Sequence, residues 1–152
     1  MARAGLCLTL GLLSCGLIHK DVDIAQEFPA GGGVPSEAQV DLAGPLVSSQ
    51  GDLAHLSAVT MRAARIEATD GASVGFISGA TLTLRAPGLP DLKVATLPSP
   101  STSARADLTV DSTRDLKPYL VAGSKLTAEL TYAPTPPAVR TLRLTITVRG
   151  SL

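Results

Sequence analysis

The feature that most constrains this 152-residue chain is a strict alternation of apolar and polar side chains near its C-terminus. Successive side chains of a β-strand point to opposite faces, so a period of two predicts a strand with one buried face. The apolar positions are Leu142, Leu144, Ile146 and Val148, and the polar ones are Thr141, Arg143, Thr145, Thr147 and Arg149. We therefore expect an aliphatic inner face and an outer face of threonine and arginine.

Shorter runs with the same period lie between clusters of glycine and proline along the chain. Their apolar positions are Val40 and Leu42; Leu82, Leu84 and Ala86; Ala106, Leu108 and Val110; and Leu126, Ala128, Leu130 and Tyr132. Residues 92–97 predict a further short strand. With no long helical pattern, the sequence predicts an all-β fold. We expect a single antiparallel β-sandwich of about seven short strands, of immunoglobulin-like type.

Residues 52–69 combine two patterns. Asp52 is a good helix N-cap ahead of leucines spaced three residues apart, which predicts a short helical turn over residues 52–56. Apolar residues then alternate, but the alternation changes phase near Ala64. One phase change is what a β-bulge produces, so we expect a bulged strand over residues 58–68.

Composition limits the kind of core and the kind of partner. The chain has no tryptophan, two phenylalanines and two tyrosines, so aliphatic side chains must fill the interior. We expect Tyr119, in a predicted helical turn, to cover one end of that core. The shortage of aromatic residues argues against a stacking platform, and 13 basic against 13 acidic residues leave no charge excess for nucleic acid.

The N-terminal segment has the anatomy of a secretory signal peptide. Arg3 is followed by a charge-free apolar run over residues 4–13, which is too short for the ~20 residues that span a bilayer. The string at the end of this run, Leu12-Leu13-Ser14-Cys15, resembles the lipobox of bacterial lipoproteins. The resemblance implies that residues 1–14 are removed as a signal peptide. It also implies that Cys15 is lipidated, with palmitate or a similar chain, as the first residue of the mature protein.

The resemblance to lipoproteins implies an address. Gly16 stands where lipoproteins retained in the inner membrane usually carry aspartate, so the resemblance implies sorting to the outer membrane of a Gram-negative type of cell. The domain is then expected to face either the periplasm or the cell surface. Several acyl chains, at ~0.8 kcal/mol per buried CH₂, would make attachment to the membrane effectively permanent.

Residues 15–37 are polar and rich in glycine and proline. Acidic residues at Asp21, Asp23 and Glu27 precede the run 31–33 of three glycines. Such a composition buries little apolar area to offset the entropy of ordering the chain. We therefore expect a flexible tether that links the lipidated Cys15 to a globular domain over residues 38–152.

Candidate catalytic residues do not form a convincing set. Gly71, Ser73 and Gly75 spell the G-x-S-x-G string of serine hydrolases, but the partner histidine of that fold follows the serine, and none occurs after His55. His19 and His55 are the two histidines of the chain, and no HxxxH or CxxC spacing surrounds them. We predict no catalytic residue, no metal site and no cofactor.

Three aspartates spaced by four, Asp107, Asp111 and Asp115, leave a weak calcium site as an open alternative. Calcium takes six or more oxygen ligands, and extracellular domains often supply them from loop carboxylates. Arg114 lies between two of these aspartates, which favours ordinary salt bridges and turn caps.

Together these features predict a non-enzymatic outer-membrane lipoprotein that serves as a structural or binding component of a cell-envelope assembly. Its expected partners are the membrane, through Cys15, and a protein of the envelope, with no nucleic acid. The alternative is a periplasmic carrier of an apolar ligand held between the sheets, which requires a cavity lined by leucine and valine. A hydrolase centred on Ser73 is disfavoured because no histidine follows it in the chain.

Overall fold

The computed structural model describes residues 18–152; Cys15 and the predicted signal peptide 1–14 lie outside the described residues. The strands are β1 (His19–Ala30), β2 (Glu37–Val40), β3 (Ala58–Ala68), β4 (Ile77–Arg85), β5 (Leu92–Thr96), β6 (Arg105–Val110), β7 (Lys125–Tyr132) and β8 (Arg140–Ser151). The helical elements are α1 (Ala43–Gln50), the 3-10 turn η1 (Leu53–His55) and α2 (Lys117–Val121). None of the described helices is long and apolar enough to cross a membrane.

The strands form one antiparallel sheet in the order β1-β8-β3-β6-β5-β4-β7-β2. The chain pairs like a long folded hairpin, β1 with β8, β2 with β7, β3 with β6 and β4 with β5. Rolling this hairpin adds the pairs of β3 with β8 and of β4 with β7. Eight strands connected in this way form a jelly roll. Strands β5 and β6 pair over a short stretch, Ala95 with Val110 and Thr96 with Thr109, and the Asp111 N–H just after β6 donates to the Val94 carbonyl at 2.9 Å.

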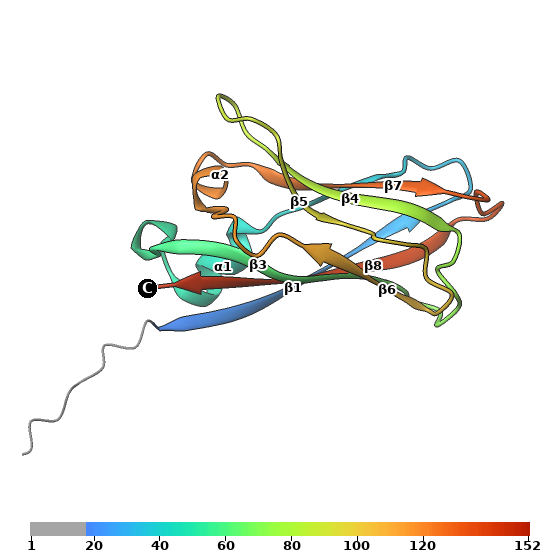
Figure 1. Ribbon diagram of the computed structural model, residues 1–152, viewed down its shortest axis with the longest axis horizontal. Coiled ribbons are helices and arrows are strands. Elements are labelled where there is room, and N and C mark those ends of the chain that lie inside the picture. The colour runs from blue at the N-terminus through green and yellow to red at the C-terminus, as the bar shows by residue number, and fades with distance from the viewer. Residues whose placement is uncertain (1–17) are drawn as a thin grey trace, which may run out of the picture.

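Figure 1 shows the sheet curling into two layers that nearly close like a barrel, with β1, β8, β3 and β6 in one and β4, β5 and β7 in the other. The predicted all-β, antiparallel class is confirmed. The immunoglobulin-like type is not confirmed, because the first two strands of that type are neighbours, whereas β1 pairs with β8 and β2 lies at the other end of the strand order.

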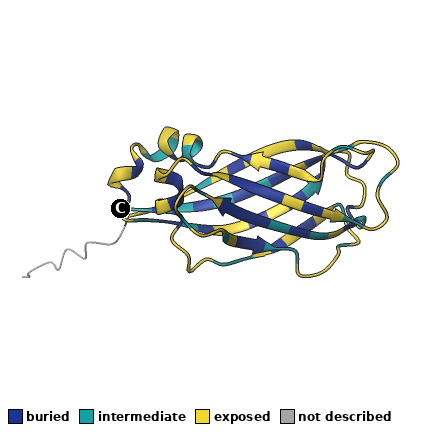
Figure 2. Cartoon of the chain, turned by 90° about the horizontal axis from the view of Figure 1, so that it is seen from above, coloured by how far each residue is buried: buried dark blue, intermediate teal, exposed yellow. Residues whose placement is uncertain are grey.

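The core lies between the two layers. Leu142, Leu144, Ile146 and Val148 of β8 are all fully buried, which confirms the inward face predicted from the alternation. Buried and exposed positions alternate along most strands in Figure 2. At ~25 cal/mol per Å² of apolar surface removed from water, this shared aliphatic interior is the main stabilising contribution of the fold.

Three local predictions are confirmed. The register of β3 against β8 shifts between Met61 and Ala63, which is the expected bulge. The Asp52 carboxylate accepts a hydrogen bond from a backbone N–H of η1 and caps that turn. Tyr119 of α2 is 8% exposed and covers one end of the core, where its hydroxyl donates to the carbonyl of Pro90 at 2.6 Å.

The flexible tether predicted for residues 15–37 is wrong over most of its length. Residues His19–Ala30 form β1, which pairs with β8 from His19 opposite Ser151 to Ala30 opposite Arg140. Ile24 and Phe28 of β1 pack into the core. The folded domain therefore includes β1 and does not begin at residue 38.

The glycine run 31–33 makes a tight turn after β1 rather than a slack linker. The three φ angles are 77°, 58° and 81°, in the left-handed region that glycine adopts without strain. A Cβ on Gly31 would lie 2.8 Å from Cβ of Pro136, and the Gly32 N–H donates to the Pro136 carbonyl at 2.8 Å. The glycines allow this turn to lie directly against the β7–β8 connection.

Candidate functional site

A shallow polar hollow of about 220 Å³ lies on the outer face of the layer formed by β1, β8, β3 and β6. All four strands contribute to its lining: Asp23, Ala63, Ala64, Arg65, Arg105, Asp107, Thr145 and Thr147. The bulge in β3 places the short side chain of Ala63 on this face, where the neighbouring positions carry longer ones. The hollow thus has a small-residue floor and a charged rim.

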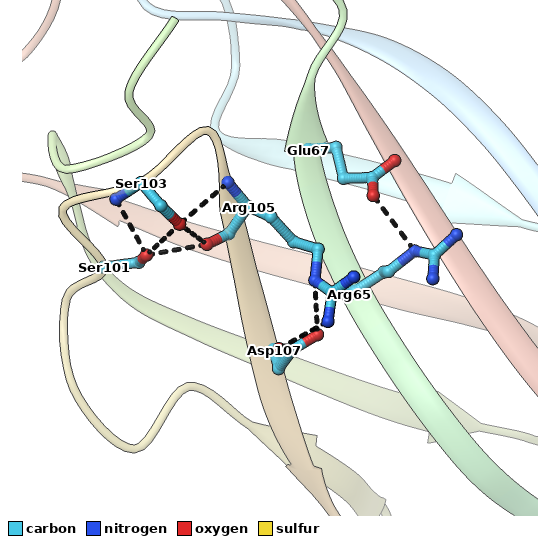
Figure 3. A network of polar contacts seen from close by, with 6 residues as sticks. All are labelled: Arg65, Glu67, Ser101, Ser103, Arg105 and Asp107. Carbon is cyan, nitrogen blue, oxygen red and sulfur yellow. Dashed lines mark hydrogen bonds and ion pairs between the residues drawn. The ribbon is translucent and has the colours of Figure 1, made fainter. Parts of the chain in front are cut away.

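Two guanidinium groups form part of the rim. Arg65 Nε lies 3.2 Å from Glu67 Oε1, and Arg105 Nε lies 3.1 Å from Asp107 Oδ1, as Figure 3 shows. Each pair joins residues two apart on one strand, so both side chains share the outer face. The side chains of Arg65 and Arg105 are 44% and 52% exposed, so these ion pairs contribute little to stability. A guanidinium has five N–H donors, which leaves donors directed at solvent.

The start of β6 is held by two serines of the preceding loop. The hydroxyls of Ser101 and Ser103 both donate to the carbonyl of Arg105, at 2.6 and 2.7 Å. Figure 3 shows this small network beside the Arg105 side chain. These hydrogen bonds fix the backbone that carries Arg105 at the rim of the hollow.

The β1 side of the same face carries acidic residues that meet β8. The Thr147 hydroxyl donates to Asp23 Oδ1 at 2.6 Å, and Arg143 Nε donates to Glu27 at 3.2 Å. A hydrogen bond from Arg149 holds the pKa of Asp21 below its usual value of 3.8. The charges that suggested a solvated linker are therefore complementary to the outer face of β8.

The hydrolase alternative finds no support in the placement of its residues. The Ser73 hydroxyl donates to the carbonyl of Thr102 at 3.0 Å and accepts from the Gly75 N–H at 3.0 Å. Ser73 follows β3 in the chain whereas His55 precedes it. A strand of 11 residues, about 35 Å long, separates the two, so the structure does not bring them together.

Two of the three aspartates proposed for calcium are engaged by local partners. Asp107 pairs with Arg105, and Asp111 pairs with Arg114 Nε at 3.1 Å. The Thr113 hydroxyl, foremost among several hydrogen bonds, lowers the pKa of Asp111. Within residues 18–152, no group of three or more histidine, cysteine, aspartate or glutamate residues is placed to hold a metal ion.

The third aspartate has a structural role. Asp115 Oδ1 accepts hydrogen bonds from the Val59 N–H at 2.9 Å and from the Lys117 N–H at 3.0 Å. The Leu116 N–H in turn donates to the Val59 carbonyl at 2.7 Å. Asp115 thereby joins the start of α2 to the start of β3.

The apolar-ligand alternative requires a cavity between the layers. The hollow described above opens on the outer face, and another of about 200 Å³ lies over the short β5–β6 junction, lined in part by Lys93, Thr96 and Asp111. The leucines and valines of both layers belong to one buried cluster. The carrier stays a prediction of the sequence that no described contact favours.

Sequence patterns indicated only part of this site. The alternation in β8 predicted that Thr145 and Thr147 face outward, and both lie in the hollow. Arg65, Arg105 and Asp23 were missed, because they meet only after four strands from distant parts of the chain have paired. The bulge in β3 was the one local signal that the outer face is irregular there.

Comparisons with known proteins assign no family to the chain. No family model matches it, and no curated protein matches it. A chain from a solved structure of Desmodium yellow mottle tymovirus is similar over 99% of this chain and 94% of its own length, at 13% sequence identity and a TM-score of 0.29. A likeness at this level carries no argument about fold or function.

Proposed function

We propose that this chain is a lipid-anchored protein of the bacterial outer membrane that serves as a non-enzymatic structural or binding component of a cell-envelope assembly. The observation that carries the proposal is the string Leu12-Leu13-Ser14-Cys15 at the end of a charge-free run, directly ahead of a folded domain. In this proposal the domain is a rigid β-sandwich of two four-stranded halves. The proposal does not depend on an immunoglobulin-like connection of the strands.

The polar hollow is the proposed contact for a protein partner. Arg65 and Arg105 keep exposed N–H donors at its rim, and Asp23 and Thr145 add acceptors from the neighbouring strands. Guanidinium donors suit carboxylates and backbone carbonyls, so a polar segment of another protein fits this surface better than an apolar one. The core holds the underlying sheet on its inner side, so the backbone that carries these side chains is already ordered. Binding a partner therefore costs little conformational entropy of the backbone.

Substitution of each cysteine tests the anchor. The chain has two cysteines, so Cys15→Ser should abolish labelling with palmitate and release the protein to the soluble fraction, while Cys7→Ser should leave both unchanged. Labelling and membrane retention that persist in the Cys15→Ser variant would overturn the anchor. Separation of inner and outer membranes on a density gradient then tests the sorting.

Photo-crosslinking in cells tests the partner surface. A photoreactive side chain at Thr145, in the hollow, should capture a defined protein, and Arg65→Ala with Arg105→Ala should reduce that capture. The matched control is the same group at the exposed position Gln39 of β2, in the other half of the sheet. If positions 145 and 39 capture the protein equally, or if the two arginine substitutions leave the capture unchanged, the hollow is not the contact for the partner.

A further inference from the structure

Large aliphatic side chains that stay exposed gather at one end of the described chain. Ile18, Val47, Val121 and Leu152 are 65%, 45%, 62% and 53% exposed, and all four belong to the end where β1 begins and β8 finishes. Val139 is also 53% exposed, but it precedes β8 at the opposite end. Single exposed aliphatic side chains are ordinary, whereas a group at one end calls for a partner.

The contacts around β1 bring two parts of this group together. The Leu152 N–H donates to the carbonyl of Ile18 at 3.1 Å, so the two residues extend the pairing of β1 with β8. Lys20 Nζ donates to the carbonyl of Ser49 at 2.7 Å, and this ties the C-terminal turn of α1 to β1. Helix α1 carries Val47.

Helix α2 completes the same end. Lys117 Nζ donates to the carbonyls of Ala54 and Leu56, which hold α2 against the η1 turn, and α2 ends at Val121. Figures 1 and 2 both show the two helices at the end of the molecule that holds the C-terminus. We call Ile18, Val47, Val121 and Leu152 the end patch.

The short length of chain between Cys15 and the domain limits how far the end patch can lie from the membrane. Consecutive Cα atoms are 3.8 Å apart, so Cα of Cys15 and Cα of Ile18 are separated by at most about 11 Å. A lipidated cysteine lies at the interface of the membrane that holds its acyl chains. The end patch is therefore confined close to the headgroups of that membrane.

We propose that the end patch rests on the lipid surface that holds the Cys15 anchor, so that the domain stands upright with its opposite end directed away. This inference rests on the proposed lipidation of Cys15. The rise of β1, about 3.3 Å per residue over 12 residues, places the loop after it about 40 Å further out. The anchor then fixes an orientation as well as a location.

Charges at this end favour insertion of the aliphatic side chains over attraction to anionic lipid. The lysines Lys20 and Lys117 lie at the same end as Asp41, Asp52 and Asp115, which accept hydrogen bonds from backbone N–H groups at the starts of the helical elements, and these five charges sum to −1. A nearly neutral surface gains little from anionic headgroups. Contact with the membrane should accordingly be insensitive to salt.

Single tryptophans test the proposal directly, because the chain has none of its own. The full lipidated chain carrying Val47→Trp, Val121→Trp or Val139→Trp is reconstituted into vesicles of phosphatidylethanolamine and phosphatidylglycerol that contain brominated lipid. Tryptophan at 47 and 121 should be quenched at least twofold, at low and at high salt. Tryptophan at 139, where the native valine at the opposite end has an exposure between those of Val47 and Val121, should not be quenched.

The outcomes separate this inference from the anchor itself. If the protein floats with the vesicles but the tryptophans at 47 and 121 are quenched no more than at 139, the resting contact is wrong and the anchor stands. If the chain carries no lipid and does not float, both proposals fall. Adding Val47→Glu to the Val121→Trp chain should lower the quenching, whereas adding Val139→Glu should leave it unchanged.

Discussion

Arg149 of β8 donates two hydrogen bonds to Asp21 of β1, from Nε to Oδ1 at 2.6 Å and from Nη2 to Oδ2 at 2.9 Å. The two residues face each other across the outermost pair of strands. The bond raises the pKa of the Arg149 guanidinium and lowers that of the Asp21 carboxyl. Together with Glu27 and Arg143, this pair joins the acidic N-terminal segment to the basic face of β8.

Removal of β1 should prevent the domain from folding. A chain that lacks residues 1–30 loses the twelve-residue partner of β8 and the core residues Ile24 and Phe28. Its exposed strand edge and apolar face favour aggregation. A chain that lacks only residues 1–17 should give a monomer with β-type circular dichroism and a cooperative melt. A cooperative monomer from the shorter chain would show that β1 is dispensable.

Substitutions on the two faces of β8 should differ sharply in effect. Leu144 and Ile146 are fully buried, so Leu144→Asp or Ile146→Asp places a carboxylate in the core at a cost of several kcal/mol, which is comparable to the whole stability of such a domain. Thr145→Lys on the outer face should change stability by less than about 0.5 kcal/mol. Thermal unfolding followed by circular dichroism measures both effects. If the Asp variants melt at the same temperature as the unsubstituted protein, Leu144 and Ile146 do not lie on the buried face of β8.

Asp115→Ala should destabilise the fold more than Asp107→Ala. Loss of Asp115 leaves the N–H of the buried Val59 without its acceptor, at a cost of about 1–3 kcal/mol. Asp107 belongs to an exposed ion pair, worth at most about 1 kcal/mol. Urea unfolding with and without added calcium measures the free energies. If calcium raises the stability of the unsubstituted protein and either substitution abolishes that rise, these aspartates do form a calcium site.

Acid should destabilise the domain through three aspartates whose pKa is held below the usual 3.8, Asp21, Asp70 and Asp111. The largest causes are hydrogen bonds from Arg149, the Ala72 N–H and the Thr113 hydroxyl, respectively. Because the folded pKa lies below the unfolded one, the stabilising contribution is complete above the unfolded value and is lost as the pH falls through the folded values. Tm should be level above about pH 5 and should fall below about pH 4. Replacing the three aspartates with asparagine should flatten that fall.

Tyr132→Phe should keep or raise stability. Burial raises the pKa of the Tyr132 phenol. The nearby Gly31 amide lowers this pKa by a smaller amount, although the two groups are not placed to form a hydrogen bond. The hydroxyl makes no hydrogen bond within the described residues, so its removal leaves no partner unsatisfied. Since the folded pKa of Tyr132 lies above the unfolded one, the domain that carries this tyrosine becomes less stable as the pH rises past about 10. Tm measured from pH 8 upward should therefore fall less in the variant.

The sequence predicted those elements whose information is local. Strand β8, the bulge of β3 and the capped turn at Asp52 depend on residues within one segment, and the structure confirms all three. Helix α1 was missed because its local signals are poor: it contains Gly44 and Pro45, its N-cap residue is the apolar Leu42, and it buries only Leu46. Its packing against β1 holds it in place.

Tertiary structure decided what the N-terminal segment becomes, which strands are neighbours and where the hollow lies. The acidic residues of β1 predict a solvated linker when that segment is considered alone. They predict a strand only when Arg143, Thr147 and Arg149 are known to lie opposite. Alternation within a strand fixes which face is buried, because that preference is a property of each side chain. The pairing of β1 with a strand more than a hundred residues away depends on complementary charge and shared burial, which appear only once the chain has folded.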